Sequence, residues 1–152
     1  MTAPFFVDSN LLVYVADAAI PSKQERAEKW IAALWRSRLG RLSVQVLNEY
    51  YVTVTQRLVP PMQGAEARRH VDALMAWKPA PVDEFLVRHA WTVQDRFGFS
   101  WWDCLIVAAA QTQGCRYLVT EDMQHGQELN GVTVISPFRA DPDEFPEITA
   151  RR

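Results

Sequence analysis

Two short stretches, PFFVDSN at residues 4–10 and YLVTED at residues 117–122, decide the fold of this 152-residue chain. Each begins with an apolar run and closes with acids, Asp8 in the first stretch and Glu121 and Asp122 in the second. Neither run alternates between apolar and polar residues, which is typical of strands that are buried on both faces of a sheet. Both stretches therefore predict buried strands that end in carboxylates.

Strand and helix patterns alternate along the rest of the chain. Short strands are predicted at 4–7, 41–44, 117–120 and 132–136, a brief extended segment at 79–82, and helices at 11–17, 22–36, 45–58, 67–75, 83–97 and 100–113. Such alternation is typical of a parallel sheet with helices on both faces. We predict an α/β protein with three α/β/α layers and a short, mostly parallel central sheet.

Local signals place the ends of several elements. Ser22 and Glu25 have the spacing of a capping box and predict a helix start, and Asp83 is a second candidate N-cap. The segment 45–58 fits a helical stripe, although its centre also alternates like a strand, and we favour the helix. The acidic, proline-bearing segment 140–152 is predicted to be an extended tail that follows a domain over 1–139.

The composition excludes several classes of protein. Apolar residues make up 49% of the chain, which is enough for a core and excludes a disordered protein. With 16 basic and 18 acidic residues the net charge is −2, so any contact with nucleic acid needs a local patch. Two cysteines form no disulfide framework, and neither a membrane span nor a secretory signal is apparent. We expect a cytoplasmic protein that does not bind membranes.

Acids follow two of the predicted strands, and parallel strands end at one edge of a sheet, where ligands bind in such folds. Asp8 and Asp122 are therefore expected to lie close together, with Glu121 as a neighbour. Asp103 lies in the apolar segment WWDCLIVAAA, where an unpaired carboxylate is costly, so it is a third candidate. The alternatives are solvated loop acids and, for Asp103, a helix cap formed with Ser100. Clustered carboxylates need a cation, and oxygen ligands favour Mg²⁺ or Mn²⁺.

The order of the motifs FVDSN, SVQVLNEYY, FSWWDCLIVAAA, LVTEDMQHGQ and ISPF resembles the PIN-domain ribonucleases, and more closely the toxins of VapBC-type toxin–antitoxin pairs. The resemblance covers residues 4–139. It implies four metal-binding catalytic acids, which fall on Asp8, Glu49, Asp103 and Asp122. From its place on the predicted helix alone, Glu49 would be interpreted as a solvated residue.

Ser9, Asn10 and Glu121 are supporting candidates in this site, and His125 could approach it. The resemblance implies a Mg²⁺- or Mn²⁺-dependent endoribonuclease that is inhibited by an antitoxin protein, and homodimers are common among such toxins. The alternatives are a Mg²⁺-dependent phosphatase or phosphotransfer domain, which would want an acid where Asn10 stands, and a phosphate-binding module without turnover.

Six tryptophans are many for a chain of this length, and in a nuclease they could stack on bases. Trp30, Trp35 and Trp77 lie on or near predicted helix stripes, so we expect them in the core. Trp101 and Trp102 flank Asp103 and are the candidates for contact with a substrate.

Overall fold

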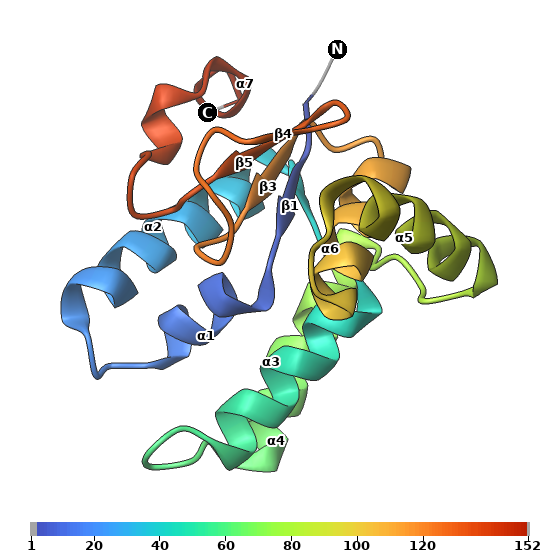
Figure 1. The fold of residues 1–152 in the computed structure, drawn as a ribbon. Helices are drawn as coiled ribbons and strands as arrows, with labels where there is room; N and C mark the ends of the chain where they lie inside the picture. The colour runs from blue at the N-terminus through green and yellow to red at the C-terminus, as the bar shows by residue number, and fades with distance from the viewer. Residues whose placement is uncertain (1–2, 152) are drawn as a thin grey trace.

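The computed structural model describes residues 3–151, and within them one five-stranded sheet lies between helices (Figure 1). The strand order is β2-β1-β3-β5-β4. All pairs are parallel except the last, in which β4 runs antiparallel to β5. The strands are β1 (Phe5–Val7), β2 (Gly40–Arg41), β3 (Tyr117–Val119), β4 (Glu128–Leu129) and β5 (Val132–Ile135). The predicted three-layer α/β/α class is confirmed.

The helices cover both faces of the sheet. In Figure 1, α2 and α7 lie on one side of the strands and α5 and α6 on the other, while α3 and α4 extend together away from the sheet. The helices are α1 (Ser9–Ala16), α2 (Pro21–Ser37), α3 (Val44–Gln56), α4 (Gly64–Leu74), α5 (Glu84–Phe97), α6 (Trp101–Thr112) and α7 (Pro146–Thr149), with single 3₁₀ turns η1 (Met75–Trp77) and η2 (Pro142–Glu144). Within residues 3–151, none of these helices is long and apolar enough to cross a bilayer.

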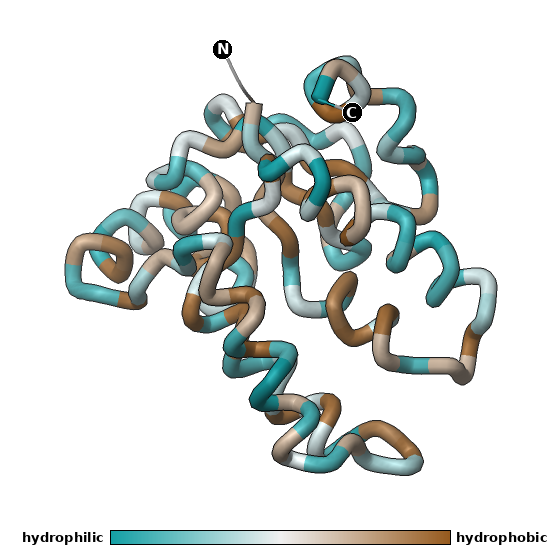
Figure 2. Tube along the Cα trace, turned by 180° about the vertical axis from the view of Figure 1, so that it is seen from behind, coloured by the Kyte–Doolittle hydropathy of each residue, from teal (hydrophilic) through white to brown (hydrophobic). Residues whose placement is uncertain are grey.

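The core sits on the central strands and on α6. All three residues of β1 and of β3 are buried, and the central strands carry the brown, hydrophobic colour in Figure 2. Residues 104–110 of α6 are all buried, and three successive alanines let this helix approach the sheet closely. The unalternating apolar runs of the sequence are thus explained by burial on every side.

Several predicted boundaries need correction. The helix α2 begins at Pro21, and no side chain caps it, so the capping box of Ser22 and Glu25 is wrong; proline fits the first helical turn because its missing N–H has no partner to lose there. The strand predicted at 41–44 is only Gly40–Arg41, because Ser43 caps α3 by accepting a hydrogen bond from the Val46 amide (3.3 Å). The helix over this region and the Asp83 cap are confirmed.

The C-terminal segment also differs from its prediction. It was predicted to be extended, but it forms η2 and α7, and Ile148 is buried against the core. Apolar side chains spaced through this acidic segment supply that anchor. The division at residue 139 stays a prediction. Trp30 and Trp77 are buried as predicted, whereas Trp35 is 40% exposed at the end of α2.

Candidate active site

The ends of β1 and β3 lie level with one another, because the sheet register pairs Val7 with Val119. Asp8 follows β1 directly, and its backbone N–H donates to the carbonyl oxygen of Val119 (3.1 Å), so the ladder continues into the acidic residue. Thr120 and Asp122 follow β3 at the same edge. The predicted approach of the acids at the carboxyl ends of parallel strands is therefore realised in the backbone.

Asp8 is buried and held from both sides. One carboxylate oxygen accepts from the Ser9 backbone N–H (2.7 Å), and the other accepts from the Thr120 hydroxyl (2.9 Å). Asn10 lies in the first turn of α1, and its Nδ2 donates to Thr120 Oγ1 (3.1 Å) and to the Asp122 carboxylate (3.0 Å). The start of α1 is therefore tied to the loop after β3 by a chain of polar contacts.

Glu49 reaches this edge from the middle of α3. Its two carboxylate oxygens accept from Ser9 Oγ (3.3 Å) and from Gln45 Nε2 (3.5 Å). It is half-buried and points back toward the start of α1, although the sequence pattern by itself favoured a solvated residue. Helix packing explains the difference, because α1 and α3 are in contact and the buried face of α3 runs through Val46 and Tyr50, so Glu49 lies at the border of this face.

Asp103 lies in the first turn of α6, where its backbone N–H donates to the Ser100 hydroxyl (3.3 Å). The capping role weighed for this pair is therefore present. The Asp103 side chain also interacts electrostatically with Glu49 and with Asp122. A cap and a place in the acidic cluster are compatible for this residue.

The electrostatics of the site are those of like charges brought together. Burial raises the pKa of Asp8 to about 7, against the hydrogen bonds from Thr120 and Ser9, and the charges of Glu49 and Asp122 raise it further. Burial is also the main cause of the raised pKa values of Glu49 and Asp103, with neighbouring acids adding to it. We call these four residues, Asp8, Glu49, Asp103 and Asp122, the acidic cluster.

Glu121 is not part of the acidic cluster. Its carboxylate forms an ion pair with Lys23 (3.2 Å) and accepts a hydrogen bond from the Tyr14 hydroxyl. The Lys23 ammonium in turn lies 4.9 Å from the centre of the Tyr14 ring. Glu121 thus ties the loop after β3 to α1 and α2. His125 is likewise engaged in the fold, since its Nδ1 accepts from the Ser136 backbone N–H (3.0 Å).

The donor atoms of the site suit a hard cation. Within residues 3–151, no three His, Cys, Asp or Glu side chains stand close enough to enclose a metal ion by themselves. Mg²⁺ does not need such an enclosure, because it usually binds through one or two carboxylates and keeps several waters or phosphate oxygens. Asn10 Oδ1 is buried at this edge and accepts no hydrogen bond from the described part of the chain. An oxygen without a hydrogen-bond donor, next to several carboxylates, is suited to bind a cation.

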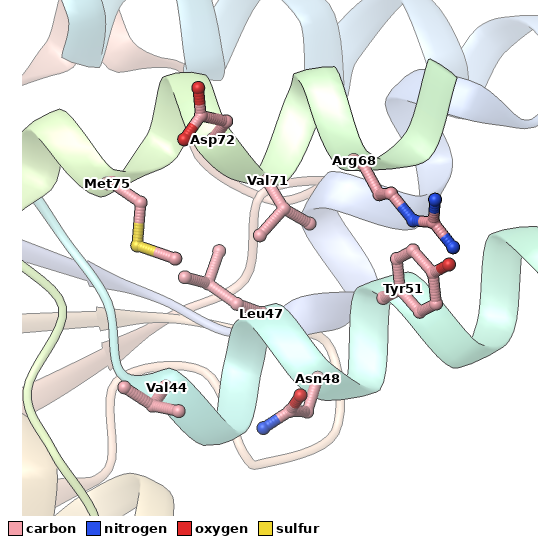
Figure 3. Close-up of a pocket in the computed structure, with 8 residues that line it drawn as sticks. All are labelled: Val44, Leu47, Asn48, Tyr51, Arg68, Val71, Asp72 and Met75. Carbon is pink, nitrogen blue, oxygen red and sulfur yellow. The ribbon is translucent and has the colours of Figure 1, made fainter. Parts of the chain in front are cut away.

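The apolar groove between α3 and α4 lies apart from these acids (Figure 3). Leu47 and Val71 face each other across it, and the guanidinium of Arg68 lies beside Tyr51 at one end. No member of the acidic cluster lines this groove. The acidic cluster therefore lies outside this groove.

The sequence comparison settles the family. The model of the PIN domain matches residues 5–127, which include the whole acidic cluster and the strands β1 to β3. The chain belongs to the PIN-domain family. No curated protein sequence matches this PIN domain.

Solved structures that resemble this PIN domain include a toxin and a toxin–antitoxin complex. VapC20 of Mycobacterium tuberculosis, described as a toxin that cleaves the sarcin-ricin loop, is 20% identical with a TM-score of 0.56, over 75% of this chain and 86% of its own. FitAcB of Neisseria gonorrhoeae is 18% identical with a TM-score of 0.59, over 90% and 99%. A toxin–antitoxin complex from Klebsiella pneumoniae is 16% identical with a TM-score of 0.60, over 89% and 98%. At these identities the likeness concerns the fold.

Two residues of this PIN domain site were missed by the sequence reasoning. Thr120 donates to Asp8 and accepts from the Asp122 backbone N–H (3.1 Å), so it sets the spacing between two acids. Gln45 donates to Glu49 and to the carbonyl oxygen of Trp102 (3.2 Å) and so links α3 to α6. The signal for Gln45 was present, since a residue four positions before Glu49 lies on the same helix face.

Proposed function

We propose that this PIN domain is a Mg²⁺- or Mn²⁺-dependent endoribonuclease whose metal-binding catalytic residues are Asp8, Glu49, Asp103 and Asp122. One observation carries the proposal. The charge of Asp122, in the loop after β3, raises the pKa values of Asp8 at the end of β1, Glu49 of α3 and Asp103 of α6. Within residues 3–151, the hydrogen bonds to these acids come from neutral donors. A divalent cation and an RNA phosphate would complete such a site.

The residues of the chain have distinct tasks in this proposal. Asp8 and Asp122 would hold the cation from the strand ends, and Glu49 and Asp103 would hold it from the helices. Asn10 keeps Asp122 in place through its Nδ2, and its buried Oδ1 has no hydrogen-bond partner within residues 3–151, while Ser9 fixes Glu49. When bound, the cation stabilises the negative charge that develops on the phosphodiester during hydrolysis. In the absence of a cation the acids repel the substrate, so activity depends on the metal.

The geometry of Asp8 disfavours the phosphotransfer alternative. A nucleophilic aspartate needs an exposed oxygen that can attack in line. Asp8 is 4% exposed, so neither of its carboxylate oxygens is open to such an attack. Each oxygen accepts one hydrogen bond and keeps a second lone pair, with which it can still bind a cation. Asn10 also stands where that chemistry wants a second acid.

The toxin role rests on the family and on the neighbours with known structures, several of which are toxin–antitoxin complexes. By analogy we propose a cytoplasmic toxin with a cognate antitoxin protein as its partner and a homodimer as its assembly. An antitoxin that covers the acidic cluster would block both the cation and the RNA.

Cleavage of bulk RNA tests the nuclease function. The purified protein is incubated with RNA in Mg²⁺, in Mn²⁺ and in EDTA, beside Asp8→Asn and the remote control Glu84→Gln. We expect cleavage with either metal, none in EDTA, and a loss of about a hundredfold or more for Asp8→Asn, since a metal ligand supplies several kcal/mol in the transition state. Metal-independent cleavage, or an active Asp8→Asn protein with a native circular dichroism spectrum, would contradict the assignment.

Growth tests the toxin role separately. Expression of the wild type without a partner is expected to arrest a bacterial culture, and Asp103→Asn should relieve the arrest at the same protein level. Equal growth of both cultures would remove the toxin role and leave the nuclease function to the cleavage assay.

A further inference from the structure

An open hollow of about 410 Å³ adjoins the acidic cluster on the side of α3 and α6. It is lined by Gln45, Asn48 and Glu49 of α3, by Trp102 and Leu105 of α6, and by Val82. Glu49 belongs both to this lining and to the acidic cluster. A group seated in the hollow would therefore be next to a group bound at the acids.

The chemistry of the lining selects a neutral, flat ligand. Glu49 contributes the one charge among the six lining residues, and that charge is negative, so an anion such as a phosphate is disfavoured. Trp102 and Val82 offer exposed apolar surface, 63% and 43% of each side chain. The exposed Asn48 amide can donate and accept hydrogen bonds at the rim. An aromatic wall beside amide groups suits a nucleobase, which is planar, uncharged and polar only at its edge.

The tryptophan is held in register with the catalytic residues. Gln45, which is 8% exposed, donates both to the Trp102 carbonyl oxygen (3.2 Å) and to the Glu49 carboxylate (3.5 Å). Trp102 also precedes Asp103 directly in the first turn of α6. The backbone of Trp102 is thus held by Gln45 on one side and by its chain neighbour Asp103 on the other, while its ring stays exposed.

We infer that this hollow is a base-binding subsite in which Trp102 stacks on an unpaired nucleobase adjacent to the phosphate that is cleaved. The inference rests on the proposed nuclease function and narrows its substrate class. Bases of a duplex are already stacked on their neighbours and cannot stack on a side chain, so the preferred substrate is RNA with an unpaired nucleotide at the cleavage point. Trp102 is then a substrate-binding residue, and Gln45 is a positioning residue.

Steady-state cleavage of a single-stranded RNA oligonucleotide in Mn²⁺ tests the subsite. Loss of base–aromatic stacking in Trp102→Ala is expected to raise KM by about 5- to 150-fold, with a smaller change in kcat. Trp102→Phe keeps a stacking ring and should recover most of the affinity. Trp91→Ala is the matched control, because Trp91 is also exposed (51%) but does not line the hollow. Equal KM values for the wild type and Trp102→Ala would overturn the inference.

A binding measurement separates this inference from the proposed function. In EDTA the acidic cluster weakens RNA binding in all variants alike, so the comparison between variants remains informative. A labelled single-stranded oligonucleotide should bind the wild type and Trp102→Phe more tightly than Trp102→Ala, and more tightly than a duplex of the same sequence. This result supports the subsite even where no RNA is cleaved, which would count against the nuclease function alone. Wild-type binding by Trp102→Ala, or a change of oligomeric state in that variant, would assign the hollow to something other than a base.

Discussion

Glu121 and Asp122 are neighbours in the chain, but their carboxylates lie in two different electrostatic surroundings. Glu121 is paired with Lys23 and hydrogen-bonded by Tyr14, so its charge is neutralised within the fold. Asp122 faces Asn10 and the repulsion of three other acids. The charge of Glu121 is thus balanced within the fold, whereas the charge of Asp122 lacks a cationic partner among the described residues.

This difference separates an acid that is neutralised within the fold from the acids that we propose bind a cation. Within the described residues, the fold places Lys23 beside the acid that fastens the loop to α1 and α2, whereas the hydrogen bonds to the acidic cluster come from neutral donors. Neutral donors reduce the cost of burying a carboxylate without cancelling its charge. The charge that remains is what a divalent cation would bind.

The largest effect is expected when the two neighbours are exchanged for their amides. Asp122→Asn should lower the rate of metal-dependent RNA cleavage by about a hundredfold or more, because it removes a proposed metal ligand. Glu121→Gln should leave the rate within a few-fold of the wild type, because it changes only the attachment of the loop. Both rates are measured at saturating Mn²⁺. Equal losses in the two variants would abolish the distinction between the two acids.

The pH dependence of stability gives a smaller, signed test. Burial raises the pKa of Asp8 in the folded protein from its ordinary value of 3.8 to about 7, so the folded protein binds more protons than the unfolded chain between these pH values. The free energy of unfolding in EDTA should therefore fall as pH rises from about 4 to about 7, by on the order of 4 kcal/mol for this group. Urea unfolding across this range measures it.

Asp8→Asn is the control for this measurement because it keeps the shape and cannot ionise. Its free energy of unfolding should fall less steeply over the same pH range. The stability of the variant relative to the wild type should therefore increase as pH rises. Parallel curves for the two proteins would show that Asp8 ionises freely in the folded state, and the electrostatic account of the site would fail.

The smallest effect is expected when Glu121 loses its ion pair with Lys23. Lys23→Met should lower the melting temperature slightly, because ion pairs at the surface contribute little to stability. Its cleavage rate should stay close to that of the wild type. Lys29→Met, which removes a similarly exposed lysine paired with Asp141, is the matched control. A loss of cleavage confined to Lys23→Met would place Glu121 and its partner in the active site.

The sequence was sufficient for the sheet and for two of the acids. The apolar runs before Asp8 and Asp122 have no alternation, and parallel strands bring their ends together whatever the loops do. The helical stripe over 45–58 was long enough to outweigh its strand-like centre. These predictions depend on periodicity, which is a local property.

The remaining features depend on contacts between distant segments, which periodicity does not contain. Glu49 turns toward the site because α3 packs against α1, and Lys23 meets Glu121 across 98 positions of the chain. The resemblance to PIN domains pointed to Glu49, but nothing in the sequence indicated that Lys23 would neutralise Glu121. The acidic, proline-bearing composition of the segment 140–152 predicts an extended tail, and it gives no sign that Ile148 is buried.

Mn²⁺ binding, measured by electron paramagnetic resonance, tests directly whether the acidic cluster holds a divalent cation. The signal of free Mn²⁺ is recorded while the wild type, Asp103→Asn and Glu121→Gln are titrated at pH 8 without RNA. We expect the wild type and Glu121→Gln to remove free Mn²⁺ with the same Kd, and Asp103→Asn to weaken binding by about tenfold or more, as substitutions at and around metal ligands do. Undiminished free Mn²⁺ with the wild type, or equal binding by Asp103→Asn, would contradict the account.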